Sequence, residues 1–188
     1  MMPFVHKIRK ARYGILAVVP AIVMGTLFTE QFDLVDNAAP IIVQLMDNIW
    51  GIILITCLGP LLEELIFRLA ILGGLLRWTP INPWISIIIS AFLFALAHWN
   101  PAQTPVAMAM GIMLGTFYWR SGLWLSLSVH IFNNTLAAVE YRISPNICLT
   151  DRIGGPLTVW TLIILCTVFV LYCMNKYIQE TKLTTDIQ

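Results

Sequence analysis

The chain contains repeated apolar runs close to the length that a helix needs to cross a bilayer, about 20 residues. Hydrophobic side chains make up 59% of the 188 residues and charged ones only 11%, whereas soluble domains carry roughly 25% charged residues. The sequence therefore predicts an all-α, polytopic transmembrane helix bundle that forms one domain over residues 1–188. The apolar runs give six expected spans: Tyr13–Thr29, Asn48–Trp78, Trp84–His98, Pro105–Trp119, Leu123–Tyr141 and Pro156–Tyr177.

The second of these runs, Asn48–Trp78, is too long for one straight crossing. We expect it either to tilt or to break at Gly59-Pro60, because proline removes a backbone donor from a helix. The stretch before it, Glu30–Asp47, mixes polar and apolar residues. That mixture is typical of an interfacial or re-entrant segment.

The distribution of basic residues predicts the orientation. In the six-span arrangement, Arg142 and Arg152 fall on one side of the membrane. The other side carries eight basic residues: Lys7, Arg9, Lys10, Arg12, Arg77, Arg120, Lys176 and Lys182. Because basic residues favour the cytoplasmic side, we expect an integral, multi-pass protein of the cell or plasma membrane with both termini in the cytoplasm. Beyond the amino terminus there is no basic patch, which argues against a nucleic-acid partner.

Three polar clusters interrupt the apolar helices. The sequence reads E-E-L-I-F-R over residues 63–68, F-A-L-A-H over 94–98 and H-I-F-N-N over 130–134. An ionisable group at membrane depth costs about 2.5–3.5 kcal/mol on insertion scales, so such residues usually serve a function. Glutamate, histidine and asparagine are groups that activate a water and stabilise an oxyanion. The clusters therefore predict hydrolysis at a site within the membrane.

The clusters are also expected at one depth. Three residues at the predicted cytoplasmic boundary serve as reference points: Arg77, Trp84 and Arg120. Glu63 lies fourteen residues before Arg77, and His98 lies fourteen after Trp84. Asn134 lies fourteen residues after Arg120, and His130 lies ten after it. At a rise of 1.5 Å per residue, all four fall about 15–21 Å from that boundary. Three separate helices thus present polar side chains at the same level.

Helical phase separates the roles within each cluster. Glu64 and Arg68 are four residues apart with the acid first, the favourable order for an ion pair, and we interpret them as a structural pair. Glu63 points about 100° away from Glu64, so we interpret it as the free carboxylate that faces the cavity and acts as general base. His130 and Asn134 share a helix face.

A stripe of small residues marks the fourth span. Ala107, Gly111 and Gly115 recur at every fourth position, a pattern that lets a neighbouring helix approach closely. We interpret this stripe as a packing feature. Phe94 stacks on His98 by the same spacing and is expected to wall the site.

The three motifs resemble those of the CPBP family, which comprises CAAX-type intramembrane endopeptidases and bacteriocin-processing or immunity proteins. E-E-x-x-x-R, F-x-x-x-H and H-x-x-x-N occur here in the family's order. The resemblance implies a catalytic core over about residues 59–135. It also implies an endopeptidase that cleaves near a membrane anchor or tail, with a membrane-anchored peptide or protein as substrate and the lipid bilayer as its surroundings.

The resemblance also implies roles for individual residues. Glu63 would activate the attacking water, assisted by His98. His130 and Asn134 would hold the oxyanion of the tetrahedral intermediate, with each such donor typically worth about 3–4 kcal/mol. The implied catalytic set is Glu63, Glu64, Arg68, His98, His130 and Asn134.

Two cofactor hypotheses remain at this stage. Glu63, His98 and His130 are residue types that bind Zn²⁺, but the sequence has no H-E-x-x-H motif. We favour glutamate-type hydrolysis with no cofactor and keep a zinc metalloprotease as the alternative.

Two other function classes also place glutamate and histidine inside a membrane. One is a non-catalytic immunity or scaffold protein of the same fold, which would not require the complete catalytic set. The other is a small transporter or proton relay. Transporters usually show internal repeats or paired broken helices, and this sequence shows no such symmetry. The sequence therefore favours the endopeptidase.

Overall fold

The structure is a computed structural model that describes residues 4–32, 34–143 and 148–182, with side chains described from residue 11 to residue 181 of those ranges. Every regular element in these ranges is a helix, which confirms the predicted all-α bundle. Two of the elements, labelled η, are π-helical. In chain order the elements are α1 (Phe4–Thr29), α2 (Ala39–Met46), α3 (Ile49–Ile53), η1 (Leu54–Leu58), α4 (Gly59–Glu63), η2 (Glu64–Leu72), α5 (Gly73–Trp78), α6 (Pro83–Ala97), α7 (Thr104–Ser121), α8 (Leu123–Ile143), α9 (Leu149–Ile153) and α10 (Pro156–Lys182).

All six predicted spans coincide with helices. Three helical stretches are long and apolar enough to cross a membrane by length and composition: Ala11–Thr29, Ile49–Trp78 and Pro156–Thr181. Helix α6 is apolar but shorter, and α7 and α8 are not among the stretches that meet this criterion in the described ranges. That α6, α7 and α8 also cross the bilayer stays a prediction.

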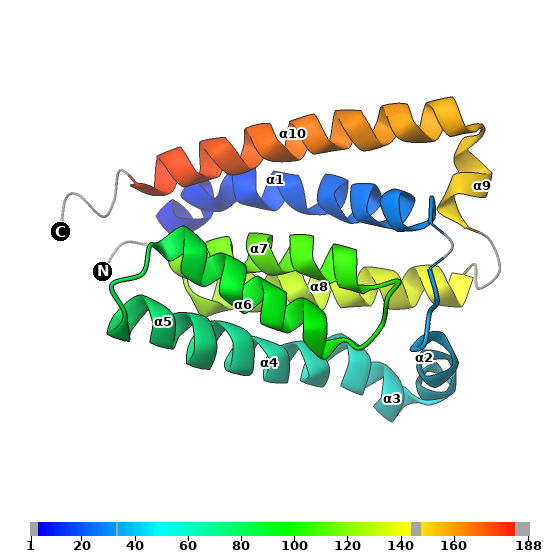
Figure 1. Cartoon of the computed structure of the whole chain (residues 1–188), viewed down its shortest axis with the longest axis horizontal. Coiled ribbons are helices and arrows are strands. Elements are labelled where there is room, and N and C mark those ends of the chain that lie inside the picture. The colour runs from blue at the N-terminus through cyan, green and yellow to red at the C-terminus, as the bar shows by residue number, and fades with distance from the viewer. Residues whose placement is uncertain (1–3, 33, 144–147, 183–188) are drawn as a thin grey trace.

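The helices pack in two groups around α7 and α8 (Figure 1). Helices α1 and α10 run antiparallel along one long face and contact each other extensively. The helix that covers residues 49–78 and helix α6 lie toward the opposite face. This arrangement places α8 between the candidate catalytic segment and the α1–α10 pair.

One end of the bundle gathers the starts of α1, α6 and α8 and the ends of α5, α7 and α10 (Figure 1). Arg77 lies in the last turn of α5 and Arg120 in the last turn of α7, so two of the basic residues counted for orientation share this end. The side chains of Lys7, Arg9, Lys10 and Lys182 lie outside the described residues. The cytoplasmic position of this end stays a prediction.

Helices α6 and α7 approach each other unusually closely. A Cβ built on Gly111 would stand 2.9 Å from the Cα of Ala91, which is closer than real Cβ contacts. A Cβ on Gly115 would meet Ile87 at 3.1 Å, and Ala107 packs in one cluster with residues of α6. The predicted small-residue stripe therefore faces α6, and the packing interpretation is confirmed.

The helix over residues 49–78 continues without a break at Gly59-Pro60. Of the two alternatives expected from the sequence, the break is therefore wrong, and the tilt stays a prediction. The chain avoids the break by winding residues 54–58 as a π-helix, in which the Gly59 N–H donates to the carbonyl of Leu54. Pro60 has no N–H, so the next carbonyl, that of Ile55, has no donor from within the helix. Asn134 of α8 supplies one, with its Nδ2 3.0 Å from that oxygen.

The segment before this helix is tied to the connection between α6 and α7. One carboxylate oxygen of Asp36 accepts the backbone N–H groups of Ala38 and Ala39, each at 3.0 Å, at the start of α2. The same oxygen accepts Nδ2 of the buried Asn100 at 2.8 Å. These contacts fix α2 against the bundle, and the interfacial position of Glu30–Asp47 stays a prediction.

Candidate active site

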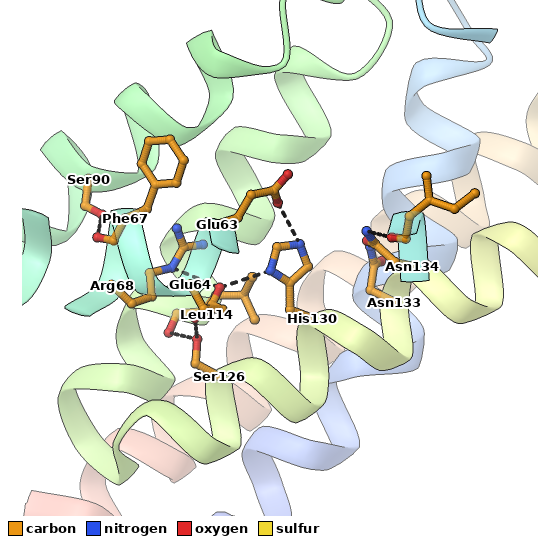
Figure 2. A network of polar contacts seen from close by, with 11 residues as sticks. Glu63, Glu64, Phe67, Arg68, Ser90, Leu114, Ser126, His130, Asn133 and Asn134 are labelled. Atoms are coloured by element: carbon orange, nitrogen blue, oxygen red, sulfur yellow. Dashed lines mark hydrogen bonds and ion pairs between the residues drawn. The ribbon is translucent and has the colours of Figure 1, made fainter. Parts of the chain in front are cut away.

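Two adjacent glutamates contact opposite nitrogens of one histidine. Glu63 ends α4, Glu64 begins η2, and His130 lies on α8. His130 Nε2 is 3.3 Å from Glu63 Oε2, and His130 Nδ1 is 3.0 Å from Glu64 Oε1. Figure 2 shows the imidazole held between the two carboxylates. The structure thus brings the first and third sequence clusters together through His130.

The two carboxylates differ in their surroundings. The Glu64 side chain is fully buried, whereas the Glu63 side chain is 34% exposed. Glu64 Oε1 also lies 3.4 Å from Nε of Arg68, one turn along η2, which confirms the predicted Glu64–Arg68 ion pair. Glu63 keeps one face open. The separation into a buried supporting carboxylate and an accessible one follows the phase argument.

Arg68 is a fully buried cation beside the site. Its guanidinium carbon lies 4.4 Å from the ring centroid of Phe94, a cation–π contact that α6 provides. Its two terminal nitrogens have no hydrogen-bond partner among the described residues. The Glu64 carboxylate and the Phe94 ring therefore stabilise the buried positive charge of Arg68.

Ser126 belongs to the site, and the sequence reasoning missed it. Its hydroxyl is fully buried on α8, 2.6 Å from Glu64 Oε2 and 3.0 Å from the carbonyl oxygen of Leu114. A hydroxyl has one proton, so it donates to one of these acceptors at a time. The signal for it was available: Ser126 lies four residues before His130 and therefore on the same helix face.

Asn134 holds a backbone group rather than facing His130 directly. Its Nδ2 donates to the carbonyl of Ile55, as described above, while its Oδ1 accepts Nδ2 of Asn133 at 3.1 Å. Figure 2 shows both asparagines one turn along α8 from the imidazole. Because an amide nitrogen carries two hydrogens, one hydrogen of Asn134 stays available for another acceptor.

The contacts of His98 in the structure are with Phe94, one turn earlier on α6. Its Nδ1 is 2.8 Å from the carbonyl oxygen of Phe94, and its ring centroid lies 4.7 Å from that of Phe94. The Phe94 ring also contacts His130, at 5.6 Å between centroids. Within the described part of the chain, no hydrogen bond or ion pair joins His98 to Glu63. The Phe94 ring thus contacts both histidines, and its role as a wall of the site stays a prediction.

The alternative zinc ligands are not arranged as a metal site. Among the described residues, no group of three or more His, Cys, Asp or Glu side chains gathers in a geometry that could hold a metal ion. Both nitrogens of His130 face carboxylates, and His98 Nδ1 faces a backbone carbonyl. The candidate ligands therefore do not fit Zn²⁺ in this arrangement.

Comparison with known proteins finds a family similar to this segment. Residues 45–136 match the family model described as Type II CAAX prenyl endopeptidase Rce1-like. The matched segment runs from the end of α2 into α8 and contains all seven residues of the three motifs. The resemblance inferred from the motifs is therefore confirmed.

Two curated relatives align with about half of this chain. The "Membrane-embedded CAAX protease MroQ" of Staphylococcus aureus (strain USA300) is 31% identical over 99 residues, which is 50% of this chain and 40% of MroQ. The "Putative membrane peptidase YdiL" of Bacillus subtilis (strain 168) is 32% identical over 89 residues, 47% of this chain and 36% of YdiL. The alignments therefore cover well under half of each relative. No solved structure matches the chain.

Proposed function

We propose that this chain is an intramembrane endopeptidase in which Glu63 activates a water for attack on a peptide bond. The observation that carries the proposal is the contact between the accessible Glu63 carboxylate and His130, whose other nitrogen lies on the buried Glu64. A carboxylate held in this way is oriented before substrate arrives. The Rce1-like match over the same residues supports the same reaction class.

His130 links the two carboxylates, with Nε2 toward Glu63 and Nδ1 toward Glu64. A buried carboxylate is tolerated away from water when an opposite charge and hydrogen bonds compensate it. Arg68, 3.4 Å away, supplies that charge to Glu64. Ser126 supplies a further donor to Glu64.

The reaction follows from these positions. Glu63 takes a proton from the water as the water oxygen attacks the carbonyl carbon. The oxyanion that forms accepts the Nε2–H of His130 and the second amide hydrogen of Asn134. When the carbon–nitrogen bond breaks, Glu63 returns its proton to the leaving nitrogen and becomes a carboxylate again. His98 contacts Phe94 and forms no hydrogen bond or ion pair with Glu63 among the described residues, so it assists the water only after a movement of its side chain.

The surroundings of Glu63 favour a substrate that reaches the site through the membrane. Leu62 and Ile66, which flank Glu63 along the helix, are 56% and 51% exposed. Exposed aliphatic side chains on a helix of membrane-spanning character face hydrocarbon. We therefore propose a peptide or protein held by a membrane anchor or a membrane-spanning tail as the substrate class.

The first experiment compares peptide termini in membranes from cells that express the wild-type chain, Glu63→Gln or Glu140→Gln at equal levels. Glu140 is an exposed glutamate near the end of α8 and serves as the matched control. We expect new termini with wild type and Glu140→Gln but not with Glu63→Gln. Identical termini from all three, with each variant folded, would instead support the non-catalytic scaffold of the same fold.

The same assay separates the metal-free reaction from the zinc alternative. We expect cleavage to survive a zinc chelator, because the candidate ligands do not form a metal-binding group in the described residues. Loss of cleavage that added Zn²⁺ restores would assign the reaction to a metalloprotease.

A further inference from the structure

A second site lies on the other side of the bundle from the carboxylates. Helices α1, α7 and α10 enclose an apolar cavity of about 460 Å³, a size within the range of roughly 300–1,000 Å³ for small-molecule sites. Four methionines contribute to its walls: Met24, Met110, Met113 and Met174. Methionine adapts its shape to flexible apolar ligands. Figure 1 shows where these helices lie, with α7 beside the α1–α10 pair.

The length of the groove matches one leaflet of a bilayer. Along α7 its lining runs from Val106 to Thr116. Thr116 lies ten positions after Val106, which at a rise of 1.5 Å per residue is about 15 Å. The hydrocarbon core is about 30 Å thick and consists of two leaflets, so a single acyl chain extends over about half of that distance. Two walls of the groove, α1 and α10, are themselves long and apolar enough to cross a membrane.

The two ends of the groove differ. Trp84 lines the end at which α6 begins, and its ring packs edge-on against Trp119 at 5.5 Å between centroids. The guanidinium of Arg120 lies 3.7 Å above the Trp119 ring, one helical turn beyond Thr116. Tryptophan and arginine at the end of an apolar slot are the groups that meet lipid headgroups at a membrane surface. No charged side chain lines the groove itself.

We propose that this groove binds one acyl chain of an anionic glycerophospholipid, with the phosphate headgroup at Arg120. The apolar walls and the length select the chain, and the positive charge at the Trp84 end selects the headgroup. The site is separate from Glu63 and does not depend on the protease assignment. It is a structural lipid site that fills the space between α7 and the α1–α10 pair.

The test places a photo-crosslinker inside the groove. Ala109 lines the cavity and is exposed to it, so p-benzoylphenylalanine at this position adds bulk without displacing the core. The matched control carries the same group at Ala137, an exposed alanine on α8 that does not line the groove. Both proteins are reconstituted in nanodiscs of phosphatidylcholine with a minority of phosphatidylglycerol. Mass spectrometry then identifies the adducts.

We expect adducts at position 109 to be enriched about fivefold in phosphatidylglycerol over its share of the disc, since one basic residue near an anionic lipid is worth about 1 kcal/mol. At position 137, the fraction of adducts that contain phosphatidylglycerol should equal its fraction in the disc. The enrichment should disappear in Arg120→Gln and persist in Arg120→Lys, which keeps the charge. It should also persist in Arg77→Gln, which removes an exposed cation from the same end of the bundle.

Three results would overturn the proposal. If phosphatidylglycerol made up the same fraction of the adducts at position 109 as of the disc lipids, the groove would be an unselective lipid surface. Crosslinks from position 109 to a second copy of this chain would make the groove a dimer interface. Enrichment that Arg77→Gln removes as completely as Arg120→Gln would assign the preference to the general charge of this end. Because Arg120→Lys retains the cation, its result remains decisive if Arg120→Gln does not fold.

Discussion

The protein has two packing regimes that meet at α7 and α8. Between η2, α6 and α8, buried polar groups determine the arrangement: Glu64 contacts Arg68, Ser126 and His130, and Ser90 donates to the Phe67 carbonyl at 2.7 Å. The α1–α10 pair instead packs through apolar clusters built on Val18, Leu27, Val159, Ile163 and Tyr177. One half of the molecule is held by directional contacts, and the other by shape and hydrophobic area.

The difference matters because the two kinds of contact constrain atoms differently. A hydrogen bond between buried groups fixes distance and angle, and losing one partner leaves the other unsatisfied. Apolar packing tolerates exchanges that conserve volume. Catalysis needs atoms held to fractions of an ångström, so the polar half is where a hydrolytic site can be built. The apolar half has room for the adaptable groove.

The largest expected effect lies in the polar half and concerns activity. Glu63→Gln keeps the volume and polarity of the side chain but removes the base. We expect cleavage of the substrate identified by the terminus comparison to fall by about 10²–10⁴-fold, the range that general base catalysis supplies. The measurement is the rate of product formation in reconstituted vesicles. A rate within threefold of wild type would contradict the assignment of Glu63, by the order-of-magnitude standard for such losses.

The adjacent glutamate should show its effect in stability. Glu64→Ala leaves Arg68 buried without its carboxylate, and breaking a buried pair typically costs about 3–5 kcal/mol. Glu63→Ala is the matched control, because the Glu63 side chain is partly exposed and forms no ion pair with Arg68 among the described residues. Thermal unfolding in detergent, followed by circular dichroism, measures both. Equal destabilisation by the two variants would contradict the division of roles between neighbouring carboxylates.

Much of the fold, and the Glu64–Arg68 pair of the site, could be predicted from the sequence, because both depend on periodicity within single helices. The six apolar runs correspond to helices, and the four-residue spacing of Glu64 and Arg68 gave their ion pair. Contacts across helices were harder. The contacts of His130 with both glutamates were not predicted, because the relative rotation of two helices cannot be obtained from the sequence of either one alone.

The errors around proline have a different origin. Pro60 predicts a break only if every residue of the helix follows the i to i−4 pattern. Here a π-helical stretch precedes it, and the carbonyl left open at Ile55 accepts a hydrogen bond from Asn134, 79 positions away in sequence. Local patterns contain no information about such a distant donor. Ser126, by contrast, was detectable, because it shares a helix face with His130.

An intermediate effect is expected where α6 and α7 meet at the border of the polar half. Gly111→Val places a branched side chain against the Ala91 backbone, and overpacking of this kind costs about 1–3 kcal/mol. Gly155→Val is the control, since nothing lies within 4 Å of a Cβ built there. The readout is again thermal unfolding. A helix pair that absorbed the valine without loss of stability would show that the contact between α6 and α7 is not rigid.

The smallest effect is expected in the α1–α10 pair. Arg12 of α1 lies 2.8 Å from Glu180 of α10, but the side chains are 50% and 29% exposed. An ion pair in contact with water gains little, because solvent screens the attraction and the long side chains lose conformational freedom. We expect Arg12→Gln to leave thermal unfolding unchanged, in low salt and in high salt alike. The opposite result would have two parts: Arg12→Gln clearly lowers the unfolding temperature, and high salt lowers that of the wild type by as much. Charge, and not apolar packing, would then hold α1 against α10. The contrast between the two halves would then be one of burial alone, since both would depend on ion pairs.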